Sequence, residues 1–246
     1  YGISNVHNVS SGEDVQTAIS AIKKLKVQIL KISPNQYQIF GLGIGFKKFK
    51  GTINFNNSGT TLRLLTGLLA TSEVDAKLIG DSSLSKRPLR IVSLMEKFFA
   101  TFNPRNKNYL PIKISGYPDS IQSELAVNEP SAQMVSACIL AGMNSHGITT
   151  IKAPNLQRDH TELMLKYLKY PIKIQNKKNS KIIKIRGKQF LKSEKNYLVP
   201  GDPSSAAFLI VLTLLSKSSN LVLPNILLNP KRIGFLNVLK KMGGSI

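Results

Sequence analysis

The stretch "NSGTTLRLLTGLLA", residues 57–70, decides the fold of this chain. It opens with small hydroxyl residues around a glycine and continues with apolar residues at helical spacing, which predicts a helix capped by Ser58. The same pattern returns in "PSAQMVSACILAGM" (130–143) and in "PSSAAFLIVLTLL" (203–215). The serines that open these segments are spaced 73 residues apart: Ser58, Ser131 and Ser204. Equal spacing indicates duplication of one structural unit.

The remainder of each 73-residue unit also repeats. Amphipathic patterns start near Asp14, Arg87, His160 and Lys231. Short β-branched stretches bounded by Gly, Pro or Asn predict strands. They are "VDAKLIG" (74–80), "LPIKISG" (110–116), "GITTIKA" (147–153), "KIIKIRG" (181–187) and "NLVLP" (220–224). Two helices and about four strands per unit predict an α/β domain assembled from copies of one fold unit.

A cluster of Pro and Gly around Asp202 marks a boundary in the chain. The segment "VPGDPSSAAF" (199–208) follows a basic strand and opens the most apolar helix of the sequence. We expect the chain to cross between two domains here, with residues 1–199 in the first and residues 200–246 in the second. An ordinary strand-to-helix turn with an Asp or Ser cap is the alternative interpretation.

The composition excludes several classes of protein. The chain has 246 residues, of which 42% are hydrophobic and 19% are charged, so we expect a folded core and not disorder. A single cysteine and three scattered histidines exclude a disulfide framework and a metal site built on Cys or His, and we expect no cofactor. That cysteine, Cys138, lies in an apolar helical run and is expected to pack in the core. No apolar stretch reaches the roughly 18 residues of a membrane-spanning helix.

The charge of the chain is strongly positive. Lys and Arg number 34 against 13 Asp and Glu, which gives +21 and a pI near 10.1. A polyanion or a small anionic ligand fits this balance, and so does a genome rich in A and T. The strand "SKIIKIRGKQF" (180–190), with one wet face of basic residues, contains one aromatic residue, Phe190. Because binding of nucleic acid needs aromatic residues among the charges, we expect no nucleic-acid partner.

The first candidate site lies at residues 58–63. Gly59 lets a ligand approach the backbone, and Thr60 adds a hydroxyl beside the free amides of the first helical turn. Arg63 follows within one turn. An anion site is one interpretation, and helix capping alone is the other.

A second candidate lies in "GDSSLSKRPLRIV" (80–92). Lys86 and Arg87 precede Pro88, whose ring suits the first turn of a helix. We expect a helix to begin there, so that two cations oppose its dipole, a conflict that often marks function. A solvated basic turn is the alternative.

Two further segments open helices. Ser131, Ala132 and Gln133 open one of them, and the Gln133 amide can both donate and accept hydrogen bonds. Arg158 precedes the other, with Asp159 or Thr161 as its natural cap, and the Arg158 guanidinium suits an anion.

Together, five segments resemble one protein family. They are "NSGTTLRLLTGLLA", "GDSSLSKRPLRIV", "SAQMVSACILAGM", "RDHTELML" and "VPGDPSSAAFLIV". Their order and approximate spacing are similar to those of 5-enolpyruvylshikimate-3-phosphate (EPSP) synthase, the shikimate-pathway enzyme that glyphosate inhibits. The resemblance runs from about residue 12 to the end and covers only the middle of such an enzyme.

This resemblance implies a fold and a reaction. The fold is the enolpyruvyl transferase-like α/β fold, in which repeated βαβαββ units form a two-domain inside-out α/β barrel around a cleft. The reaction transfers the enolpyruvyl group from phosphoenolpyruvate to the 5-hydroxyl of shikimate 3-phosphate and releases phosphate. We expect the complete enzyme to be a cytoplasmic monomer with these two small anions as its partners.

The resemblance also implies roles for individual residues. Phosphoenolpyruvate would be held by Gly59, Arg87 and Gln133. Shikimate 3-phosphate would be held by Ser131, Ala132, Gln133 and Arg158, with Thr60 and Arg63 as supporting residues. Glyphosate-sensitive members of the family keep a glycine at the position of Gly59, so we expect the complete enzyme to be sensitive.

The catalytic residues of the family fall outside these 246 residues. Its Lys-Ser-x-x-x-Arg motif belongs before Tyr1, and its Asp, Lys-Glu pair and later Arg and Lys residues belong after Ile246. We therefore expect both ends of the chain to be cut and the chain alone to lack synthase activity. We also expect the helix at 204–215 to be short of packing partners.

Two other interpretations stay open. UDP-N-acetylglucosamine enolpyruvyl transferase shares the fold, although "SLSKRP" and "RDHTE" favour the shikimate enzyme. A non-catalytic remnant that binds anions or nucleic acid also fits the charge, and a polyanion binder would show a steep dependence of binding on salt.

Overall fold

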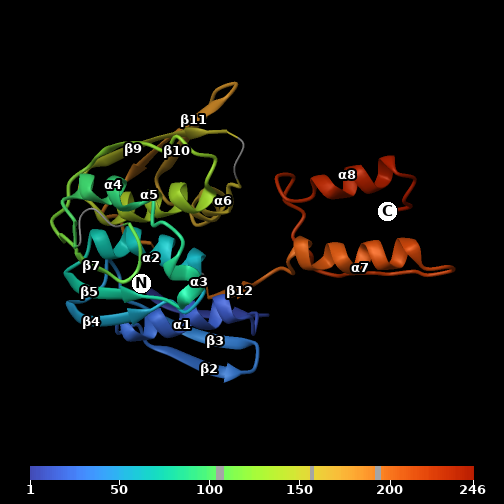
Figure 1. The fold of residues 1–246 in the computed structure, drawn as a ribbon, viewed down its shortest axis with the longest axis horizontal. Coiled ribbons are helices and arrows are strands. Elements are labelled where there is room, and N and C mark those ends of the chain that lie inside the picture. Colours follow the sequence, from blue (N-terminus) through green and yellow to red (C-terminus); the bar gives the residue numbers. More distant parts are fainter. Residues whose placement is uncertain (104–107, 156–157, 192–194) are drawn as a thin grey trace. The chain divides into compact units, whose positions relative to one another are not determined.

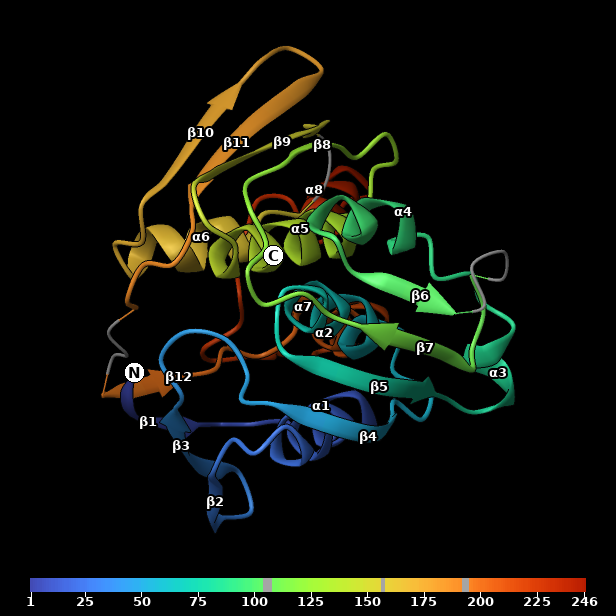
Figure 2. The ribbon, with the colours of Figure 1, turned by 90° about the vertical axis from the view of Figure 1, so that its left-hand side faces the viewer.

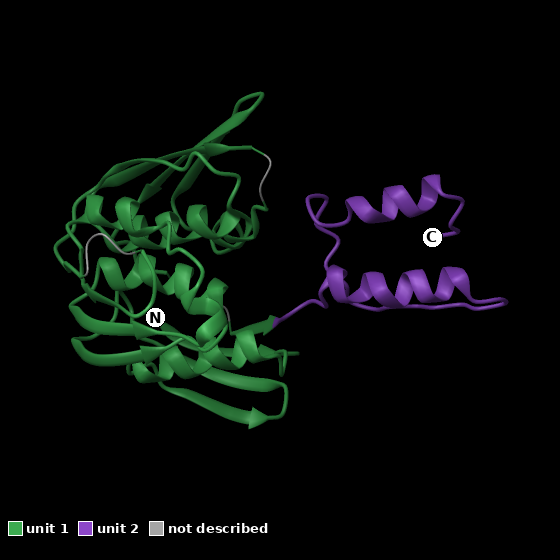
Figure 3. Ribbon diagram, viewed as in Figure 1, with its two compact units in different colours: residues 1–197 green, residues 198–246 purple. Residues whose placement is uncertain are grey.

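The computed structural model describes residues 1–103, 108–155, 158–191 and 195–246. It divides the chain into two compact units, Tyr1–Tyr197 and Leu198–Ile246 (Figure 1 and Figure 3). Three four-stranded sheets are formed by the described residues. Two of these sheets each belong to one copy of the 73-residue repeat, and the third combines strands from both ends of the first compact unit.

The repeat that contains the deciding stretch has the order βαβαββ. It runs through β4 (Phe49–Asn54), α2 (Gly59–Ala70), β5 (Val74–Ile79), the short helices α3 (Ser82–Ser85) and α4 (Val92–Met95), a 3₁₀ turn η1 (Glu96–Phe98), β6 (Thr101–Asn103) and β7 (Ile112–Ser115). Its strands lie in the order β4-β5-β7-β6. The first two strands are parallel and the other neighbours are antiparallel.

The next repeat has the same topology. It consists of β8 (Glu124–Ala126), α5 (Ala132–Asn144), β9 (Ile148–Pro154), α6 (His160–Tyr167), β10 (Ile172–Asn176) and β11 (Ser180–Arg186). The strand order β8-β9-β11-β10, with β8 parallel to β9, matches the first sheet strand for strand. The predicted duplication is therefore confirmed at the level of sheet topology.

The third sheet draws its strands from both ends of the first unit. Its elements are β1 (Gly2–His7), α1 (Glu13–Lys24), β2 (Ile29–Ser33), β3 (Gln36–Gly41) and the distant β12 (Asn196–Leu198). The order β12-β1-β3-β2 corresponds to that of the other two sheets. In it, β12 takes the place of the first strand of the repeat, and β1, β2 and β3 take the places of the second, third and fourth. Asn5 N–H donates to Lys195 O at 2.8 Å, so the end of the first compact unit is tied to β1.

The helices α2 and α5 are parallel and in register, since residues 73 positions apart meet at both ends. Thr60 bonds Gln133 at their amino ends, and Asn144 Nδ2 donates to Thr71 O at 2.6 Å at their carboxyl ends. Figure 2 shows the two helices side by side between the β4–β7 and β8–β11 sheets. Gly67 permits this approach, because a Cβ atom there would lie 2.2 Å from Ala137 O.

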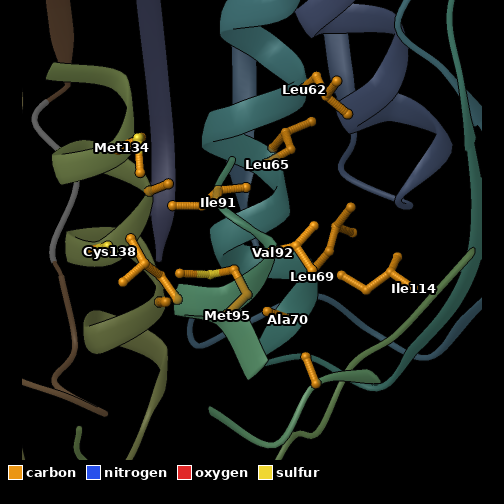
Figure 4. Close-up of a cluster of buried hydrophobic side chains, with 14 of the residues drawn as sticks. Leu62, Leu65, Leu69, Ala70, Ile91, Val92, Met95, Ile114, Met134 and Cys138 are labelled. Carbon is orange, nitrogen blue, oxygen red and sulfur yellow. The ribbon is translucent and has the colours of Figure 1, made fainter. Parts of the chain in front are cut away.

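Apolar side chains from both repeats share one core. Leu65 and Leu69 of α2 and Cys138 of α5 belong to the same buried cluster as Ile91 and Met95 (Figure 4). Cys138 is fully buried, as predicted, and burial raises the pKa of its thiol to about 12. The thiol is therefore protonated and serves for packing.

The prediction of a helix that begins at Pro88 is wrong. Asp81 caps α3 seven residues earlier, where its Oδ1 accepts the N–H of Leu84 at 2.7 Å, and Lys86 is the C-cap of that helix. Pro88 disfavours helical backbone at Arg87, so the next helix, α4, begins only at Val92. Lys86 and Arg87 thus follow a helix carboxyl end, where cations are favoured and do not conflict with the dipole.

The second unit contains α7 (Pro203–Leu215) and α8 (Gly234–Lys241). The Asp202 carboxylate caps α7 by accepting the N–H of Ser205 at 3.0 Å. Phe208 and Leu215 on α7 are about four-fifths exposed, so the second unit itself leaves an apolar face of this helix uncovered. The strand predicted at 220–224 is wrong: this stretch has no regular structure, and the one bridge in the unit, Gly201 to Ile226, lies outside it.

Within the described residues, no helix combines the length and the apolar character that crossing a membrane requires. The same residues contain no group of three or more His, Cys, Asp or Glu side chains placed to hold a metal ion.

Candidate functional site

The amino end of α2 is built as predicted, with Ser58 at its cap. Ser58 Oγ accepts the Thr61 N–H at 3.3 Å and donates to Thr61 Oγ1 at 2.8 Å. Thr61 Oγ1 in turn donates to the Asp14 carbonyl at 3.3 Å, which ties α2 to α1. Ser58 and Thr61 are buried, so this turn is packed against the protein interior, whereas Thr60 is exposed.

A short hydrogen-bond network joins the two repeats at this point. Arg63 Nη1 donates to Gly59 O at 3.2 Å and to Gln133 Oε1 at 2.9 Å. Gln133 Nε2 donates to Thr60 Oγ1 at 2.9 Å. The Gln133 amide carries two hydrogens and this bond uses one of them, so the amide is oriented and can still donate to a ligand.

A second network holds Arg87 beside the first. Arg87 Nη2 donates to Asn57 Oδ1 at 3.0 Å and to Ser83 Oγ at 2.9 Å. Asn57 Nδ2 donates to Asp81 Oδ2 at 2.6 Å. The backbone bond from Leu84, then the bond from Asn57, lower the pKa of Asp81 against a small opposing effect of burial. Sequence reasoning missed the supporting roles of Asn57, Ser83 and Asp81, although all three lie in quoted segments.

Three guanidinium groups gather where these networks meet. Burial lowers the pKa of Arg63, and the positive charges of Arg87 and Arg90 lower it further. A cavity of about 240 Å³ is lined by Arg63, Pro88, Arg90, Glu129, Ser131, Gln133 and Met134. Such a cluster suits a carboxylate or a phosphate, which guanidinium groups bind in bidentate fashion.

The remaining predicted residues lie at or just before the amino ends of α5 and α6. Ser131 caps α5, its Oγ accepting the Met134 N–H at 3.4 Å, and Ala132 is the first residue of that helix. Arg158 is exposed and lies two residues before α6. Within the described residues, the network of Arg63 and Gln133 does not extend to Arg158.

The start of α6 is fixed to its surroundings by two contacts. Thr161 Oγ1 and Ser136 Oγ of α5 lie 2.6 Å apart. Lys181 of β11 forms an ion pair with Glu162, and the two side chains are only 2% and 3% exposed. Asp159 stands at the N-cap position, but its side chain makes no capping hydrogen bond, and Thr161 is already the second residue of α6. Neither of the two predicted caps is therefore correct. Sequence reasoning also placed the lysines of β11 on its wet face and missed Lys181.

Comparison with known proteins shows that the chain is similar to one protein family. The family model described as "EPSP synthase (3-phosphoshikimate 1-carboxyvinyltransferase)" matches residues 1–246. The 3-phosphoshikimate 1-carboxyvinyltransferase of Zymomonas mobilis is 39% identical over 247 residues, covering 100% of this chain and 54% of the relative. That of Caldicellulosiruptor bescii is 38% identical, covering 100% of this chain and 56% of the relative.

Solved structures agree with the sequence relatives. An EPSP synthase structure from Acinetobacter baumannii has a TM-score of 0.86 and 32% identity, covering 98% of this chain and 54% of that one. The enolpyruvyl transferase NikO from Streptomyces tendae shares the fold, with a TM-score of 0.67 at 15% identity over 98% of this chain and 57% of that one. The chain spans about half the length of the curated relatives it matches.

Proposed function

Since the chain belongs to the EPSP synthase family, we propose that it supplies substrate-holding groups to an enzyme that transfers the enolpyruvyl group from phosphoenolpyruvate to the 5-hydroxyl of shikimate 3-phosphate. The observation that carries this proposal is the joining of Arg63, Gln133 and Thr60 from two repeats into one network. This network lies at the amino ends of the two parallel helices α2 and α5, where anions are favoured.

The roles of the individual residues follow from the motifs. Gly59, Arg87 and Gln133 hold phosphoenolpyruvate, and Ser131, Ala132, Gln133 and Arg158 hold shikimate 3-phosphate. Thr60 and Arg63 orient the Gln133 amide, which their hydrogen bonds with it support. The two substrates are anionic through their carboxylate and phosphate groups, so guanidinium groups and backbone amides are suitable partners.

The domain assignment also belongs to this proposal. Residues 1–199 form the amino-terminal substrate-binding domain, and residues 200–246 form the first unit of a second domain. The family's Lys-Ser-x-x-x-Arg motif does not occur in the sequence, so the 246-residue chain binds substrate without turning it over. A cytoplasmic location and a monomeric state stay predictions.

The Gly59→Ala variant is expected to weaken ligand binding with little change in the stability of the fold. A Cβ atom at this position would lie 2.8 Å from Arg63 Nη1, at the flexible end of that side chain. We expect the guanidinium to move off Gln133 and phosphoenolpyruvate to bind about tenfold more weakly. The free energy of unfolding should change by less than about 1 kcal/mol. Titration with phosphoenolpyruvate and urea unfolding check the two parts, and an unchanged affinity would contradict the role given to the network.

The proposal as a whole is tested by titrating the chain with shikimate 3-phosphate in a calorimeter. We expect saturation with one ligand, and an affinity loss of about 30-fold or more in Arg158→Ala, because the ligand's anionic group loses its cation. Arg186→Ala is the matched control, since Arg186 is also exposed but lies away from the site. It is the strand partner of Ile148, which follows the carboxyl end of α5, whereas the site lies at the amino end. Absence of saturable binding, or equal affinity in Arg158→Ala and the control, would refute the proposal.

A further inference from the structure

An ion pair forms part of the lining of the cavity at the site. Arg90 Nη1 lies 2.6 Å from Glu129 Oε2. Arg90 comes from the segment between α3 and α4, and Glu129 comes from the segment between β8 and α5, so the pair joins two repeats. Both residues line the cavity of about 240 Å³ together with Arg63, Ser131 and Gln133.

The two arginines of this cavity differ in what holds them. Arg63 is half-buried and donates to Gly59 O and Gln133 Oε1, both uncharged acceptors of the fold. Arg90 bonds the Glu129 carboxylate, and the two side chains are 60% and 48% exposed. Exposed ion pairs are weak and screened by solvent, so this contact is easily exchanged for another anion.

The charge at the cavity favours such an exchange. Arg63 and Arg90 line it with Glu129 as the single acidic residue among its lining residues, and Arg87 adds a further positive charge nearby. A phosphate dianion neutralises this excess better than one carboxylate does, and it presents several oxygens to the planar guanidinium.

We propose that Arg90 is a further anion-contacting residue of this site and that the Glu129 carboxylate occupies its guanidinium until the phosphate of a substrate displaces it. This inference rests on the proposed function and extends the same site. Glu129 is then an internal competitor that lowers the affinity for the substrate, and Arg90 gains its ligand only in the complex.

The test compares two variants that each remove one carboxylate from an exposed ion pair. Glu129→Gln frees Arg90. Glu73→Gln is the matched control, because Glu73 pairs with Lys48 at 2.8 Å and follows the carboxyl end of α2, the far end from the site. The 246-residue chain is titrated at constant ionic strength with shikimate 3-phosphate by calorimetry. In parallel, the ¹⁵N-labelled chain is titrated with inorganic phosphate while the Arg90 Nε–H resonance is followed.

We expect Glu129→Gln to bind shikimate 3-phosphate about two- to fivefold more tightly than the wild type, with Glu73→Gln unchanged. Adding Arg90→Ala should abolish this gain, as a double-mutant cycle requires for a direct coupling. The Arg90 resonance should respond to phosphate at a lower concentration in Glu129→Gln than in the control. Equal affinity in the two glutamine variants, or weaker binding by Glu129→Gln, overturns the inference.

The proposed function and this inference fail in different ways. If the wild type does not bind shikimate 3-phosphate, the proposed function fails, and the phosphate titration of the Arg90 resonance decides the inference alone. If Arg158→Ala abolishes binding while Glu129→Gln does not tighten it, only the inference fails.

Discussion

Replacing Lys181 by Met is expected to lower the free energy of unfolding of the first unit by about 3–5 kcal/mol, because it leaves the Glu162 carboxylate buried without its cation. Urea unfolding followed by circular dichroism measures the loss.

Two controls decide whether the buried charge is the cause. Lys184→Met removes the same charge from the outward face of β11 and should change stability by less than about 0.5 kcal/mol. Adding Glu162→Leu to Lys181→Met should restore most of the stability, because an apolar pair of similar volume replaces the ion pair. The interpretation is wrong if Lys181→Met is as stable as Lys184→Met.

A second large effect is expected from Gly67→Ala. The new methyl group would lie 2.2 Å from Ala137 O, a backbone atom that moves only if α5 moves. We expect a loss of about 2–3 kcal/mol, typical of overpacking, despite the roughly 1 kcal/mol that Ala gains over Gly in a helix. The urea midpoint and the melting temperature measure the loss.

Gly59→Ala provides the matched comparison, since it makes the same substitution in the same helix. Its methyl group meets the tip of Arg63, which can swing away, whereas that of Gly67→Ala meets a helix backbone. Equal stability of the two variants would show that α2 and α5 separate at little cost, contrary to the packing described above.

The repeat and its helices could be predicted because their signals are local. A capping serine followed by an apolar run defines each helix start wherever it stands in the chain, and Ser58 and Ser131 both act as caps. Sheet partners are not local. The pairing of β12 with β1 joins residues nearly 200 positions apart, and the stretch 220–224 has strand-like residues but no partner strand in the described part of its unit.

At the site, the sequence predicted the residue types and missed how they are held. Lys181 shares the parity of Ile183 and Ile185, the buried face of β11, so alternation alone could have indicated that this lysine points inward. Proline at position 88 is compatible both with the start of a helix and with a break after one. Asp81 caps a helix that ends before Pro88, so the proline follows a helix here. The contacts of Arg87 with Asn57 and of Arg90 with Glu129 span 30 and 39 residues and leave no local signal.

The register of α2 and α5 has a consequence for how the two copies can change. Equivalent positions face each other, and in both bonded pairs a hydroxyl residue meets an amide: Thr60 with Gln133 and Thr71 with Asn144. Two identical copies would place each residue opposite its own kind, so Thr would meet Thr and an amide would meet an amide. Gene conversion that made the copies alike again would therefore exchange these hydroxyl–amide bonds for contacts between like residues.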